Sequence, residues 1–194
     1  MAIRILEGPQ AEPISLIEAK AHLRVDDTAD DTLIDGLIRA AREYCETLQG
    51  RALMVQTIQM VLDQVPGRSF EIPLPPLVSV RSIEVSYEDG TTATVPASDY
   101  LVDTASQPGR VSLKRDADWP AENEYAELNA FSVTFEAGYG DEGEDVPQTT
   151  RQAILLLIGH WYEHREEISA GEMMQEVPMG AKALLQMNRV QFPA

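Results

Sequence analysis

The spacing of apolar residues changes twice along this 194-residue chain, and that change restricts the possible fold more than any single motif. Between residues 32 and 49, apolar side chains recur at the three- and four-residue intervals of one helical face. They are Leu33, Ile34, Leu37, Ile38, Ala41, Tyr44, Cys45 and Leu48. From residue 78 to residue 87 apolar and polar residues largely alternate, as on the two faces of a strand. Helical spacing returns after Pro147, so the pattern predicts an α+β fold with helices at both ends.

Two helices are expected before residue 50. Ser15 and Glu18 have the spacing of a capping box, and an apolar stripe follows them to about residue 25. The second helix covers residues 32–49 and is followed by Gly50, a residue type that commonly ends helices. An acidic turn lies between the two helices, and its carboxylates favour the positive N-terminal end of the second one.

The middle of the chain predicts short antiparallel strands separated by loops that contain proline and glycine. The expected strands cover residues 52–62, 78–87, 92–95, 100–102, 110–113 and 131–135. Residues 88–91 supply a hairpin turn between two of them. We therefore expect a helical bundle formed by the N- and C-terminal helices, residues 1–50 and 146–194. An antiparallel β domain is expected as an insertion at residues 51–145.

The C-terminal region predicts two further helices. Residues 153–162 are apolar on nearly every side, which is typical of a central helix. Pro147 suits the first turn of this helix, because the N–H that proline lacks would have no helical partner there. A last helix is expected over residues 179–189.

The chain is strongly acidic, with 32 Asp and Glu against 15 Lys and Arg and a formal net charge of −17. Ten of the acidic residues lie between residues 116 and 150, where there is no Lys or Arg. Such a charge disfavours generic binding to phosphate backbones and anionic membranes. The acidic stretch is interpreted either as a solvated face or as a single-sign surface that faces a basic partner or a DNA path.

Cysteine content and hydropathy restrict the compartment. Cys45 is the only cysteine, so an intrachain disulfide is excluded, and its place on a helical stripe predicts a buried packing thiol. The longest apolar run is far below the ~20 residues that span a bilayer. The first residues lack an apolar segment of signal-peptide length. We therefore expect a protein without membrane association, made in a reducing cytoplasm.

Two patterns suggest metal chemistry. His160, Glu163 and His164 match the H-x-x-E-H pattern of one class of zinc peptidases, in which histidines four residues apart share a helix face. The acidic residues of 141–145 offer oxygen ligands for calcium but lack EF-hand spacing. No nucleophile elbow, phosphate loop or dinucleotide fingerprint is present. We expect no enzyme and no cofactor, with a small zinc-dependent hydrolase as the alternative.

Methionines are concentrated at the C-terminus, where four of the seven fall in the last 22 residues. Flexible thioethers suit surfaces that adapt to a partner, although they also fill gaps in cores. Phe192, in the short apolar tail, could anchor in a groove on another chain or belong to a frayed terminus. The candidate interface residues are Met173, Met174, Met179, Met187 and Phe192.

Several blocks of residues, taken in order, resemble the phage head–tail connector (adaptor) proteins. The blocks are residues 16–26, 30–34, 40–44, 133–140, 146–147, 151–154 and 161–166. Each block is short, but together they match in order and spacing over residues 14–168. The resemblance is to the longer members, found in tailed phages and gene transfer agents, in which a β insertion separates the helices.

This resemblance implies a structural protein of a virion or virion-like particle, assembled in the bacterial cytoplasm. Members of the family are expected to form a homo-oligomeric ring, commonly of twelve copies, below the portal protein. The ring bridges the portal to the next neck or tail protein, such as a stopper, and the genome passes through it without specific binding. The C-terminal segment would reach the portal, which would give Met173 to Phe192 a use. Another neck component, such as a stopper, is the further alternative.

Overall fold

The chain folds into two compact units, which are described separately. The computed structural model describes residues 1–164 and 178–190. Residues 1–10 and 55–138 form a β unit, and residues 11–54 with the described residues from 139 onward form a helical unit. The chain therefore passes between the units three times. Sequence periodicity did not indicate that the first ten residues belong with the strands or that residues 139–145 belong with the helices.

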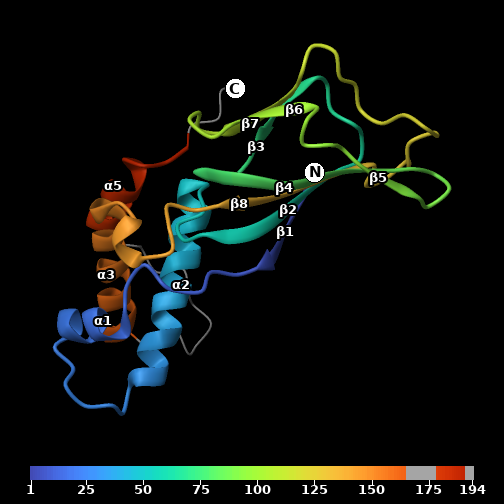
Figure 1. Ribbon diagram of the computed structural model, residues 1–194. Coiled ribbons are helices and arrows are strands. Elements are labelled where there is room, and N and C mark those ends of the chain that lie inside the picture. The colour runs from blue at the N-terminus through green and yellow to red at the C-terminus, as the bar shows by residue number, and fades with distance from the viewer. Residues whose placement is uncertain (165–177, 191–194) are drawn as a thin grey trace. The chain divides into compact units, whose positions relative to one another are not determined.

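The β unit contains two antiparallel sheets (Figure 1). The five-stranded sheet has the order β1 (Ala2–Glu7), β2 (Gln56–Leu62), β8 (Phe131–Ala137), β4 (Leu77–Ser86) and β5 (Thr92–Thr94). The three-stranded sheet has the order β3 (Ser69–Ile72), β7 (Gly109–Leu113) and β6 (Tyr100–Asp103). Strands β1 and β3 were not expected from the sequence, because few of their side chains are buried and the alternation of burial that marks a strand is weak.

Alternation along the central strands builds the core of the β unit. On β8 the side chains of Phe131, Val133 and Phe135 are buried, whereas the residues between them are only half-buried. Phe131 meets Phe70 of β3 edge to face, with ring centroids 5.4 Å apart. The ring centroids of Trp119 and Phe131 lie 5.1 Å apart, and the Trp119 indole N–H donates to the Pro66 carbonyl oxygen at 2.9 Å. These aromatic contacts join the two sheets.

The helical unit is built around one central helix, as the sequence predicts. Its helices are α1 (Leu16–Leu23), α2 (Asp31–Gln49), α3 (Gln148–Glu163) and α5 (Met179–Gln186), with a short 3₁₀ turn, η1 (Gly143–Asp145), before α3. Helix α3 packs against α1, α2 and α5. Cys45 is fully buried among these helices, and burial raises its pKa to about 12, which confirms the prediction of a packing thiol. Within the described residues, none of these helices has the length and apolarity needed to cross a membrane.

The predicted capping box is only half formed. The Ser15 hydroxyl oxygen accepts a hydrogen bond from the Glu18 N–H at 3.2 Å, which caps α1. The Glu18 carboxylate instead accepts two bonds from the Arg151 guanidinium of α3, at 2.8 and 2.9 Å. Glu18 therefore ties α1 to the central helix.

Two glycines of the helical unit should respond in opposite ways to alanine. A Cβ at Gly143 would lie 2.7 Å from the Pro13 carbonyl oxygen, a backbone atom that cannot move cheaply. We expect Gly143→Ala to lower the free energy of unfolding by about 1–3 kcal/mol. A Cβ at Gly36, inside α2, would meet nothing within 4 Å. Gly36→Ala should therefore raise the free energy of unfolding by about 0.5–1 kcal/mol through helix propensity. Urea denaturation followed by circular dichroism measures both changes, and equal effects would contradict the close approach at Gly143.

Candidate functional site

Two of the five candidate interface methionines and aromatics lie on α5, and both are exposed. Met179 begins the helix and is 87% exposed, and Met187 directly follows it and is 72% exposed. Ala183 is exposed midway between them, so the three residues are spaced four apart along one helix face. We call Met179, Ala183 and Met187 the methionine stripe. Met173, Met174 and Phe192 lie outside the described residues.

The buried side of α5 is fixed by polar bonds from the other helices. Gln49, at the end of α2, donates from its side-chain amide to the Leu185 carbonyl oxygen at 3.1 Å and to the Thr150 hydroxyl at 3.2 Å. The Gln49 carbonyl oxygen accepts from the Val190 N–H at 2.9 Å. Asn188 donates to the Thr149 hydroxyl at 2.9 Å. The methionine stripe is therefore presented on a helix whose C-terminal end is held in place by these bonds.

The charge around the methionine stripe differs from that of the rest of the chain. Residues 178–190 include the exposed side chains of Lys182 and Arg189 and contain no Asp or Glu. In a chain of net charge −17 this is a locally basic, apolar segment. This segment suits a partner surface that is apolar and acidic, because its lysine and arginine attract acidic groups. The rest of the chain, which is mostly acidic, would repel such a surface.

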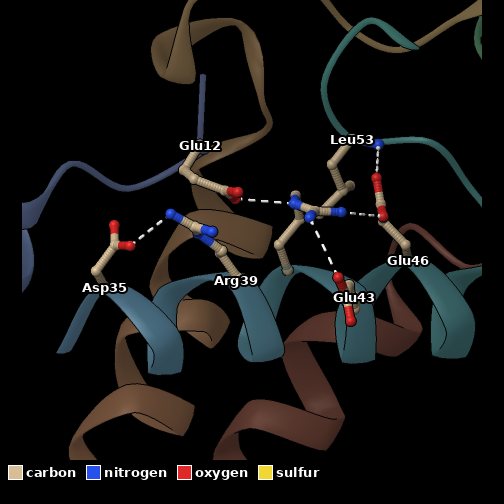
Figure 2. Close-up of polar contacts among 7 residues, drawn as sticks. Glu12, Asp35, Arg39, Glu43, Glu46 and Leu53 are labelled. Carbon is tan, nitrogen blue, oxygen red and sulfur yellow. Dashed lines mark hydrogen bonds and ion pairs between the residues drawn. The ribbon is translucent and has the colours of Figure 1, made fainter. Parts of the chain in front are cut away.

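A second feature of the helical unit is a buried charged cluster around Arg42 of α2 (Figure 2). Arg42 of α2 has a side chain only 8% exposed, and its guanidinium donates to Glu12 and to Glu46, each at 2.8 Å. Glu43 lies farther from it, at 3.5 Å. The second carboxylate oxygen of Glu46 accepts from the Leu53 N–H at 2.9 Å. Arg42 and Glu46 thus hold the segment that enters the helical unit and the turn that leaves it.

The electrostatics of this cluster indicate a structural role. Burial alone would lower the pKa of Arg42, but the Glu46 and Glu12 carboxylates outweigh it and raise that pKa. Burial raises the pKa of Glu46, and the Leu53 N–H and Arg42 offset part of that rise. The Leu53 carbonyl oxygen in turn accepts from the Tyr139 N–H at 3.1 Å, so the third passage of the chain is held beside the second. Sequence spacing could not reveal this cluster, because Glu12 is 30 residues from Arg42.

A cleft of about 600 Å³ opens on the helical unit beside the first residues of α1. Its charged lining consists of Glu12, Glu18, Asp35, Glu142, Glu144 and Arg151, and Arg151 is bonded to Glu18. The lining contains no histidine, cysteine or lysine, so it offers none of these as a base or nucleophile.

The two metal hypotheses gain no support from the described residues. His160 and His164 do share a face of α3, with ring centroids 4.6 Å apart, and His164 Nδ1 lies 2.9 Å from the His160 carbonyl oxygen. Yet within residues 1–164 and 178–190 no three His, Cys, Asp or Glu side chains converge as a metal site would require. In the acidic loop of 141–145, the Asp145 carboxylate accepts the Glu142 N–H at 3.1 Å and caps η1.

Comparison with known protein families identifies the chain. The profile of the phage gp6-like head–tail connector proteins matches residues 13–107 and 120–189, which is most of the sequence. The chain belongs to this family, whose members are structural proteins rather than enzymes, so the zinc-hydrolase alternative is not supported. No relative was found among curated proteins.

Three solved structures share the fold over the whole chain. A chain of the virion of a native gene transfer agent (GTA) particle is 20% identical, with a TM-score of 0.81. A chain of the neck of an empty GTA particle, computed with C6 symmetry, is 21% identical with a TM-score of 0.81. A chain of the neck of a native GTA particle, computed with C12 symmetry, is 21% identical with a TM-score of 0.78. Each match covers 100% of this chain and 98% of the other.

The buried cluster predicts a large difference between two arginines of α2, Arg42 and Arg39, which both belong to ion pairs. Figure 2 labels Arg39 beside its partner Asp35. Arg42→Ala removes the guanidinium that Glu12 and the largely buried Glu46 share and should cost about 3–5 kcal/mol of unfolding free energy. Arg39 is 63% exposed and its ion pair among the described residues is with the exposed Asp35, so Arg39→Ala should cost about 0.5 kcal/mol or less. Denaturant unfolding measures both.

A second variant that keeps the positive charge, Arg42→Lys, provides a measurement even if Arg42→Ala does not fold. Arg42→Lys cannot reach Glu12 and Glu46 with a planar fork, so its stability should lie between that of the native chain and Arg42→Ala. Similar losses for the Arg42 and Arg39 alanine variants would refute the structural role of the cluster.

Proposed function

We propose that this chain is a head–tail adaptor that forms a ring in the neck of a tailed phage or gene transfer agent particle. One observation carries the proposal: the connector-family match and the likeness to chains of GTA particles, two of them from necks, extend over most or all of the sequence. The ring sits below the portal protein, joins it to the next neck or tail protein, and lets DNA pass through. The C12 and C6 symmetry of the similar neck structures supports a ring of twelve copies.

The methionine stripe is the proposed contact with the portal, together with Met173, Met174 and Phe192. Three observations support it. The Met179 and Met187 side chains are exposed, Gln49 of α2 bonds the Leu185 carbonyl of α5, and residues 178–190 contain no Asp or Glu. Large flexible apolar side chains on a rigid element are typical of the anchors that contribute most binding energy.

The acidic surface suits the passage of DNA. The β unit carries 14 acidic and six basic residues, and the rest of the chain carries 18 acidic and nine basic residues. Whichever unit lines the lumen, acidic side chains outnumber basic ones about two to one. Such a lumen repels phosphates and makes few of the cationic contacts that would hold DNA in place.

Cryo-electron microscopy of particles purified from the producing bacterium tests the proposal directly. We expect this chain as a ring of twelve copies between the portal and the tail. Neck density into which this chain cannot be built would overturn the proposal, as would its absence from purified particles.

A double substitution tests the portal contact. Met179→Glu with Met187→Glu should leave folding intact, because both side chains are exposed, but should lower the number of copies per particle at least tenfold. Leu128→Glu, at another exposed apolar position, is the matched control and should incorporate normally. Quantitative mass spectrometry of purified particles gives the copy number. Normal incorporation of the double variant would remove the methionine stripe from the portal contact.

A further inference from the structure

The two sheets of the β unit end in four edge strands, and these differ in how well they are protected. Strand β5 is three residues long and exposes threonines, and β3 exposes only Ser69 and Glu71. Short length and polar or charged side chains are the usual protection of an edge against further pairing. Strands β1 and β6 instead expose aliphatic side chains, Ile3, Ile5 and Leu6 on β1 and Leu101 and Val102 on β6, and β1 exposes them beside the charged Arg4 and Glu7.

Strand β1 lies at the edge of the five-stranded sheet, and its isoleucines lie opposite buried apolar residues of β2. Ile3 pairs with Met60 and Ile5 pairs with Ile58, and both partners on β2 are buried. Ile5 itself is 59% exposed, and all six residues of β1 are exposed. Its outer edge therefore presents unpaired backbone groups beside aliphatic side chains, the combination that an added strand satisfies.

Strand β6 has the same character at the edge of the other sheet. It pairs with β7 through Tyr100 and Val102, and its Leu101 side chain is 60% exposed. Val102 is exposed as well. Figure 1 draws β1 and β6 on opposite sides of the β unit.

We propose that strand pairing joins neighbouring copies of this chain, with β1 of one copy adding to β6 of the next. A closed ring needs two different patches on each copy that match one another, and β1 and β6 are the two edges among the described strands that expose large aliphatic side chains. Main-chain hydrogen bonds between the edges fix orientation, and burial of Ile3, Ile5, Leu101 and Val102 contributes free energy. The pairing joins the five-stranded sheet of one copy to the three-stranded sheet of its neighbour. This inference rests on the proposed ring.

A charged side chain on β1 tests the pairing. Ile5→Lys should fold normally, because the position is exposed, but should lower incorporation into particles at least tenfold, since lysine on an edge opposes strand addition. Thr92→Lys adds the same charge to the protected edge β5 and should incorporate like the native chain. Equal incorporation of both variants would overturn the pairing while leaving the ring in place. If the native chain is itself absent from the neck, the proposed function fails instead.

Cross-linking supplies a second, independent measurement. In particles with Ile5→Cys and Leu101→Cys, a short bifunctional maleimide should produce a ladder of multimers, because paired strands lie ~5 Å apart. Either single variant, and Thr92→Cys with Leu101→Cys, should produce none. The native Cys45 is fully buried and does not contribute. No ladder from the Ile5 and Leu101 pair in particles that contain the chain would overturn the proposal.

Discussion

The residues next to all three passages of the chain between its units are bonded to one another through the buried cluster of Arg42, Glu12 and Glu46. Arg42 binds Glu12 just after the first passage, and Glu46 binds Leu53 just before the second. Leu53 in turn accepts a hydrogen bond from Tyr139, just after the third. A guanidinium this deeply buried is tolerated only when its partners are in place, so the three passages depend on one another. The neighbouring Gln49 holds α5, so the end of α2 positions both the junctions and the proposed interface.

Local periodicity predicted most of the helices and strands, because side-chain burial repeats at the spacing of the element. The buried stripes of α2 and α3 and the alternating burial on β8 followed directly from it. Strand β1 was missed because none of its side chains is buried, so its pattern carried no contrast. The role of Arg42 was missed for another reason: its partners are fixed by tertiary packing. Met179 and Met187 were named as interface candidates because methionines are concentrated at the C-terminus and because the family resemblance implies a portal contact there, and that contact stays a proposal.

Assembly of so acidic a chain with itself has to overcome repulsion between copies. At physiological salt that repulsion is screened beyond ~8 Å, so it acts mainly where surfaces approach closely. The proposed contacts between strand edges bring one charge of each sign from β1, Arg4 and Glu7, to the junction, so that strand adds no net charge there. The proposed portal contact would align the copies and so lower the entropic cost of bringing them together. Both features favour a ring that closes on its template over one that closes in free solution.

The hydrogen bond between the Tyr139 N–H and the Leu53 carbonyl oxygen has a consequence for engineering this architecture. The chain leaves the helical unit and returns to it at adjacent points, and the first ten residues merely precede that unit. Residues 55–138 can therefore be regarded as an insertion into the helical unit whose flanking residues are hydrogen-bonded to each other. Removal of the β unit would require trimming one terminus and closing one gap with a few residues. The helical unit could therefore be made as one continuous chain with a single new loop between Leu53 and Tyr139.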